Sequence, residues 1–123
     1  MRIRKPVEQW FEIPDDPDNG KILLKILSPG ESARIMDRAF DINVTGNGNK
    51  TSYDRQIDRE MTVKNCILDW KNFFDVDGNE LQCTDENKIR AINEIDGFLS
   101  FFTECRTDLE KNAIQWVKDH EKN

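Results

Sequence analysis

Long apolar runs are missing from this sequence, and their absence limits where the chain can work. No stretch approaches the roughly 18 apolar residues that a membrane-spanning helix needs. The first residues also lack the apolar segment of a secretory signal peptide. We therefore expect a cytoplasmic protein that makes no contact with a membrane.

Positive charge is also in short supply. Lys and Arg number 18 against 24 Asp and Glu, which leaves a formal net charge of −6. Binding to the phosphates of nucleic acids depends on an excess of basic side chains. Residues 2–5, Arg-Ile-Arg-Lys, are the single cationic cluster, and we interpret them as a solvated arm. The sequence therefore argues against a nucleic-acid partner.

Residues with reactive side chains are few and badly spaced for chemistry. The three cysteines, Cys66, Cys83 and Cys105, are odd in number and far apart, which is typical of reduced, mostly buried thiols. Neither they nor the single histidine, His120, form the close pairs of a zinc site or a Cys–His nucleophile. The Gly-rich stretch 46–49 opens no helix, so it makes no phosphate-binding loop. We expect no catalytic residues, no cofactor and no metal.

One segment, Asp75-Val76-Asp77-Gly78-Asn79, has some of the features of a calcium-binding loop. Its carboxylate and amide oxygens stand at the first, third and fifth positions, as such loops require. The obligatory glycine of the sixth position is missing, because Gly78 occupies the fourth. The segment therefore predicts a turn closed by Asp77 and Gly78 in place of a calcium site.

The 123 residues suit a single domain, 1–123, and the N-terminal part predicts a β-hairpin. Val7 to Ile13 alternates, with Phe11 on one face and Trp10 on the other, and Lys21 to Leu27 alternates as well. The segment between them, PDDPDNG, is made of turn-forming residues.

Helix signals dominate the rest of the chain. Ser28 and Glu31 form a capping box with Pro29 at the first helical position, and this helix should place Ile35, Met36, Ala39 and Phe40 on one face. Residues 46–49 predict a loop, and short strands on either side of it, around 42–44 and 53–56, stay open.

Three further helices are expected after that loop. The first starts near Asp58 and continues to Leu68 with apolar residues on one side. The second begins at Thr84, with acidic residues in its first turn, and a break follows at Asp96-Gly97. The last runs over about 98–118.

The last helix carries an apolar stripe at spacings of three and four residues. Its members are Phe98, Phe102, Cys105, Leu109, Ala113 and Trp116, while Ile114 should face solvent. Leu99 and Phe101 flank this stripe and make the apolar surface wider than one contact needs. We therefore take Leu99, Phe101 and Val117 as candidate partner-binding residues, with a domain core or a dimer contact as equal alternatives.

The segment Leu68 to Asn87, LDWKNFFDVDGNELQCTDEN, is the most informative part of the sequence. It holds a Trp and two Phe, then an Asp-Gly turn, then a Thr-led helix start. We predict a rigid structural elbow between two helices, built on Trp70, Phe73, Asp77 and Gly78.

With these residues, the chain resembles the tail assembly chaperones of long-tailed bacteriophages, including prophage copies. The likeness spans nearly the whole chain, except the loop at 46–50. The elements that carry it are Trp70, Asn72, Phe73, Asp77, Gly78, Thr84, Glu86 and Asn87.

The resemblance implies a binding protein that is not an enzyme. It would bind the long tape-measure protein, keep it soluble and recruit tail-tube proteins, either alone or as a homo-oligomer. It would work in the cytoplasm of the bacterial host and be absent from the mature virion.

The fold that we expect is α+β, with the N-terminal β-hairpin packed on a mostly helical domain. Two alternative functions stay open: a small structural phage protein of the head–tail connector type, retained in the virion, and a small hydrolase or nuclease.

Overall fold

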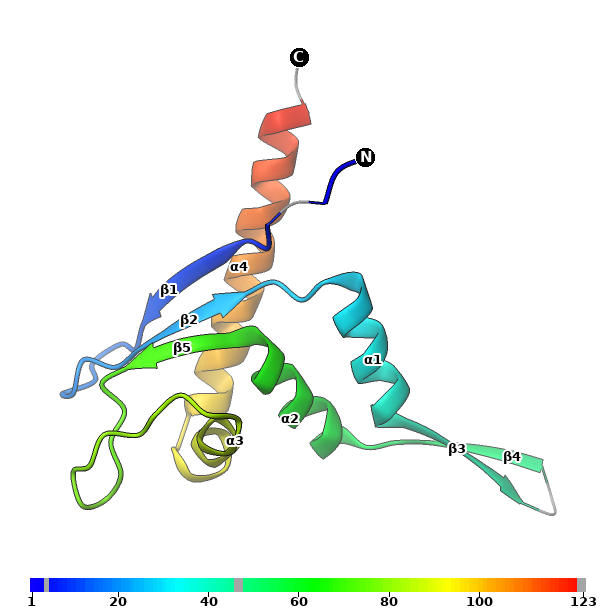
Figure 1. Cartoon of the computed structure of the whole chain (residues 1–123), viewed down its shortest axis with the longest axis horizontal. Helices are drawn as coiled ribbons and strands as arrows, with labels where there is room; N and C mark the ends of the chain where they lie inside the picture. The colour runs from blue at the N-terminus through cyan, green and yellow to red at the C-terminus, as the bar shows by residue number, and fades with distance from the viewer. Residues whose placement is uncertain (4, 46–47, 122–123) are drawn as a thin grey trace.

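The computed structural model describes residues 1–3, 5–45 and 48–121, with side chains for 1–3, 5–40 and 52–114, and has the α+β fold expected (Figure 1). The strands are β1 (Glu8–Glu12), β2 (Lys21–Lys25), β3 (Phe40–Thr45), β4 (Gly48–Tyr53) and β5 (Ile67–Lys71). The helices are α1 (Pro29–Ala39), α2 (Arg55–Cys66), α3 (Asp85–Glu94) and α4 (Phe98–Glu121). Among the described residues, no helix is long and apolar enough to cross a membrane.

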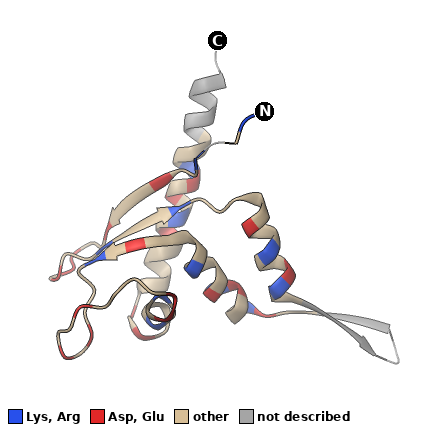
Figure 2. Ribbon diagram, viewed as in Figure 1, with Lys and Arg blue, Asp and Glu red and all other residues tan. Residues whose placement is uncertain are grey.

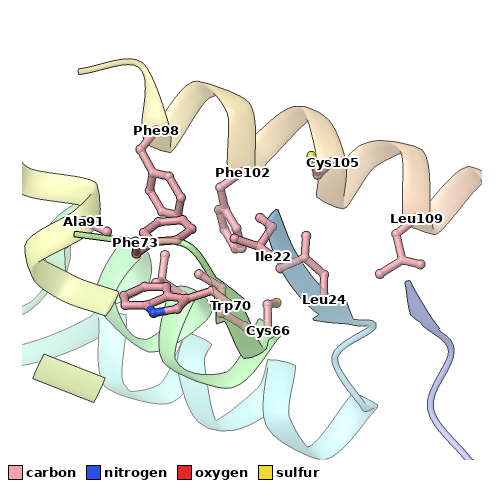
Figure 3. Packing of buried hydrophobic residues seen from close by; sticks show 12 residues of the cluster. Ile22, Leu24, Cys66, Trp70, Phe73, Ala91, Phe98, Phe102, Cys105 and Leu109 are labelled. Carbon is pink, nitrogen blue, oxygen red and sulfur yellow. The ribbon is translucent and has the colours of Figure 1, made fainter. Parts of the chain in front are cut away.

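A three-stranded antiparallel sheet, in the order β1-β2-β5, forms the centre of the fold. The predicted N-terminal hairpin is confirmed, with Trp10 opposite Leu23 in the β1–β2 pair. The long helix α4 crosses the sheet (Figure 1). Figure 3 shows Phe102, Cys105 and Leu109 of α4 close to Ile22 and Leu24 of β2. The hairpin is therefore packed on a helix, as expected.

Strand β5 corrects the prediction of a helix up to Leu68. Helix α2 ends at Cys66, and the chain continues in extended form to pair with β2. The register shifts beside Leu24, where an extra residue lies between the partners of Leu24 and Leu23, namely Ile67 and Asp69. A bulge of this kind changes the alternation of side chains. Ile67 and Trp70 are therefore both buried although they stand three apart, a spacing that imitates a helix.

The start of α1 agrees with the predicted capping box. The Glu31 backbone N–H donates to Ser28 Oγ at 3.1 Å, and the Ser28 N–H donates to Glu31 Oε1 at 3.0 Å. Ile35 is buried on the predicted face, but Met36 and Phe40 are exposed, which corrects the width of that face. Helix α1 packs mainly on α2, and a single neighbour covers only a narrow stripe.

Strands β3 and β4 form a hairpin that projects from the body of the protein (Figure 1). The strand expected around 42–44 is confirmed, but Gly48 and Asn49 belong to β4 and not to a loop. The strand expected at 53–56 is wrong beyond Tyr53, because Asp54 caps α2 by accepting from Gln56 N at 3.0 Å. The other two residues of the predicted loop, 46 and 47, lie outside the described residues.

The starts of α3 and α4 and the break between them lie where the sequence placed them, while α4 continues past the predicted end at 118 to Glu121. The Thr84 hydroxyl accepts from Asn87 N at 3.2 Å, and Gly97 has a φ of 77°, which breaks the chain before α4. Along α4 the predicted stripe is buried from Phe98 to Leu109, and Ile114 is 58% exposed as expected. The side chain of Trp116 lies outside the described part.

Candidate functional site

The predicted elbow is a stack of aromatic rings at the centre of the molecule. The indole of Trp70 lies parallel to the ring of Phe73, with centroids 4.3 Å apart, and Phe73 meets Phe98 edge-on at 5.7 Å (Figure 3). Trp70 Nε1 donates to the carbonyl of Leu81 at 2.8 Å. The stack joins β5 to α4, so the elbow follows a strand and not, as predicted, a helix.

The turn after the aromatic stack contains Asp77 and Gly78 and begins at Asp75, whose carbonyl accepts from Gly78 N at 3.1 Å. Asp75 Oδ1 accepts from the backbone N–H groups of Asp77 and Asn79, both at 2.9 Å. These hydrogen bonds, that of Asn79 first, hold the pKa of Asp75 below its usual value. Gly78 has a φ of 81° and open space around it, so its backbone conformation is what requires glycine.

The hydrogen bonds of this turn oppose the binding of calcium by Asp75. Because the Asp75 carboxylate already accepts hydrogen bonds from the loop, a cation would have to displace them. In the described part of the chain, no three His, Cys, Asp or Glu side chains converge on a position that could hold a metal ion.

The three thiols are free and protonated at neutral pH. Burial raises the pKa of Cys66 and of Cys83 to about 11, and that of Cys105 to about 12. Cys66 and Cys105 are buried in the core and Cys83 is half-buried. A thiol held protonated is a poor nucleophile, so these cysteines are packing residues.

The described candidates for partner binding, Leu99 and Phe101, lie on different flanks of α4. Leu99 is half-buried and lines a hollow of about 280 Å³ together with Arg59 of α2. Phe101 is also half-buried, but it lines a separate hollow of about 330 Å³ that includes Ile95. Val117, the third candidate, lies outside the residues whose side chains are described. The structure thus does not bring Leu99 and Phe101 into one surface.

The hollow beside Phe101 belongs to a larger apolar groove. Three adjoining hollows of about 330, 410 and 120 Å³ share lining residues, and Ile95 lines all of them. We name this feature the Ile95 groove. Its apolar lining consists of Ile13, Pro14, Pro17, Phe73, Phe74, Val76, Leu81, Ala91, Ile95, Phe98 and Phe101. Ile95 and Phe74 are each 41% exposed, so apolar surface is open to water here.

The charged residues that line the Ile95 groove are almost all acidic, and they come from several elements. They are Asp15, Asp16, Asp18, Asp75, Glu94, Asp96 and Glu104. Figure 2 shows red segments in the loop between β1 and β2 and in the loop after β5. Arg90 is the single cation among the described residues lining the groove, and it pairs with Glu94 at 2.9 Å. The groove therefore combines an apolar floor with a negative rim.

Of the residues that line this groove, only Phe101 was predicted from the sequence as a partner-binding residue. Ile95 is the C-terminal cap residue of α3, and its side chain is 41% exposed, which the sequence does not signal. The density of acidic residues between Ile13 and Gly20 was visible in the sequence. Only the fold shows that this loop lies beside Ile95.

Compared with protein-family models, curated proteins and solved structures, the chain gives no match to any of the three.

Proposed function

We propose that this protein is a phage tail assembly chaperone, a stoichiometric binding protein for the tape-measure chain that also helps to recruit tail-tube subunits. The resemblance of the segment from Trp70 to Asn87 carries the proposal. In the structure these residues have architectural roles: Trp70 and Phe73 stack, Thr84 caps α3, and Asn87 Nδ2 donates to the Gln82 carbonyl at 2.9 Å. These residues thus stabilise the fold, and the binding of a partner is left to residues on the surface of the protein.

Open apolar surface supports the same proposal. A chaperone for a long helical chain has to offer apolar contacts that water tolerates before the partner arrives. The half-buried Phe101 and the exposed Ile95 and Phe74 provide such contacts beside charged residues that keep the surface hydrated.

The test is co-expression with the tape-measure protein. We expect the chain to raise the amount of soluble partner, and Phe101→Glu to abolish this rescue while the variant stays folded. Ile114→Glu is the matched control, because Ile114 is exposed on the same helix and lines none of the grooves described above. A Phe101→Glu variant that folds and still rescues the partner would remove this face from the binding surface, and one that unfolds would assign the ring to the core.

One observation favours a second candidate, a small structural phage protein of the head–tail connector type. The β3–β4 hairpin projects from the body as a separate two-stranded sheet, and its open edges can pair with a strand of a neighbouring subunit (Figure 1). Mass spectrometry of purified virions separates the two functions, because a chaperone is absent from the particle and a structural protein is present.

A further inference from the structure

We infer that the Ile95 groove binds a cationic amphipathic helix of the partner, with the apolar side chains of that helix over Ile95 and its Lys or Arg side chains against the rim. That this helix belongs to the tape-measure protein rests on the proposed function. That it is apolar on one face and cationic on the other follows from the residues that line the groove.

The apolar part of the argument concerns the floor of the groove. Ile95 stands where its three hollows meet, with Phe74 at one end and Phe101 at the other. An amphipathic helix presents apolar side chains at spacings of three and four residues, and grooves with several adjoining hollows accept such side chains in a row. Covering Ile95 and Phe74 would remove apolar surface from water, which is the main driving force for such contacts.

The charge of the rim decides which kind of helix fits. Asp15, Asp18 and Asp96 line the central hollow, and Glu104 lines the next one. Within the described part of the chain, none of these four carboxylates lies in an ion pair. Carboxylates of one sign around an apolar floor attract a cationic ligand and repel an acidic one.

The carboxylates of the groove differ in how free they are to bind a basic side chain of the ligand. Asp16 already accepts from Gly20 N at 2.8 Å and from Asp18 N at 3.1 Å, so it maintains the loop between β1 and β2. Asp18 and Asp96 are exposed, and their carboxylates take part in no hydrogen bond within the described residues. Asp18 and Asp96 are therefore the best candidates to meet the basic side chains of the ligand.

Two synthetic helical peptides test the inference directly. Both have about 18 residues, roughly 27 Å as a helix, with Leu at spacings of three and four; the remaining positions hold Lys in one peptide and Glu in the other. By fluorescence anisotropy we expect the Lys peptide to bind, the Glu peptide to bind at least about tenfold more weakly, and added salt to weaken the Lys complex. Equal binding of the two peptides would overturn the inference.

Variants locate the binding site. We expect Ile95→Lys to weaken the Lys peptide by about tenfold or more, and the matched control Ile114→Lys to leave its affinity unchanged. The double variant Asp18→Lys/Asp96→Lys should have the same effect without touching the apolar floor, and Asp37→Lys on α1 is its control. If Ile95→Lys lowers the melting temperature, its loss of affinity can come from unfolding, and the test then rests on Asp18→Lys/Asp96→Lys. Unchanged affinity in a folded double variant would overturn the proposed site.

Co-expression with the tape-measure protein separates this inference from the proposed function. If the unmodified chain fails to solubilise the tape-measure protein while the Lys peptide binds at the groove, the proposed function fails and the binding site stands. If the unmodified chain and the folded double variant rescue the partner equally well, the function stands and the groove is not where the partner binds.

Discussion

The indole of Trp70 lies flat against the ring of Phe73, with an angle of 5° between their planes. Trp70 belongs to β5, and Phe73 follows it after Asn72, whose φ of 62° turns the chain back. The positive φ lets two aromatic residues only three positions apart stack face to face at the end of a strand. The pair connects the sheet to α4 through Phe98 and is the structural centre of the fold.

Removal of the Trp70 side chain should be the most damaging single change in this region. Trp70 is only 5% exposed, and Trp70→Ala should lower the free energy of unfolding by about 3–5 kcal/mol, measured by urea denaturation. Trp70→Phe is the control: it keeps a ring against Phe73 and loses the hydrogen bond to Leu81, so its cost should be smaller, about 1–3 kcal/mol. A loss below ~1 kcal/mol for the alanine variant would mean that the ring is not a core residue.

The capping box of α1 should make stability depend on pH. The hydrogen bond from Lys25 to Glu31, at 2.5 Å, and then the Ser28 N–H, lower the pKa of Glu31 from its ordinary value of 4.5. A carboxyl group with a lowered folded-state pKa stabilises the fold fully above pH 4.5, and this contribution disappears as the pH falls through the lower value.

Glu31→Gln should therefore unfold at lower urea concentration than the unmodified chain at pH 7, and the difference should shrink in acid. Ser28→Ala, which removes the cap itself, should cost about 0.5–2 kcal/mol. A Glu31→Gln deficit that stays constant from pH 7 down to pH 3 would contradict the assignment.

Metal ions should not affect stability. The loop residue best placed to bind calcium, Asp75, already accepts hydrogen bonds from Asp77 N and Asn79 N. Thermal unfolding curves recorded with EDTA and with sub-millimolar calcium should coincide. A rise of several degrees on adding calcium would show that the loop holds the ion after all, and Asp75→Ala should then remove that rise.

The thiols should react slowly and in a definite order. With pKa values raised to about 11 for Cys66 and Cys83 and about 12 for Cys105, little thiolate exists at pH 7.5. Because Cys83 is half-buried and the other two are buried, an aromatic disulfide reagent should modify Cys83 first. Cys83→Ser should eliminate the fastest phase, and rapid reaction of all three thiols without denaturant would contradict the packing.

Local signals predicted much of this fold. The Ser28 and Thr84 caps, the hairpin of β1 and β2 and the break at Gly97 all depend on interactions between residues close in sequence. Such interactions leave a pattern in the chain itself, because the residues that satisfy the backbone at a helix end or a turn stand at fixed spacings.

By itself, then, the sequence determined the α+β class, the caps and turns and the apolar stripe of α4, which need only local hydrogen bonds or a fixed period. Only the tertiary structure decided that Ile67 to Lys71 is a strand, since the unpaired edge of β2 and a bulge override a helical spacing of apolar residues. The Ile95 groove also exists only in three dimensions. Its floor and rim come from the loop before β2, the loop after β5 and the junction of α3 with α4, and packing on α4 brings these distant segments to one place.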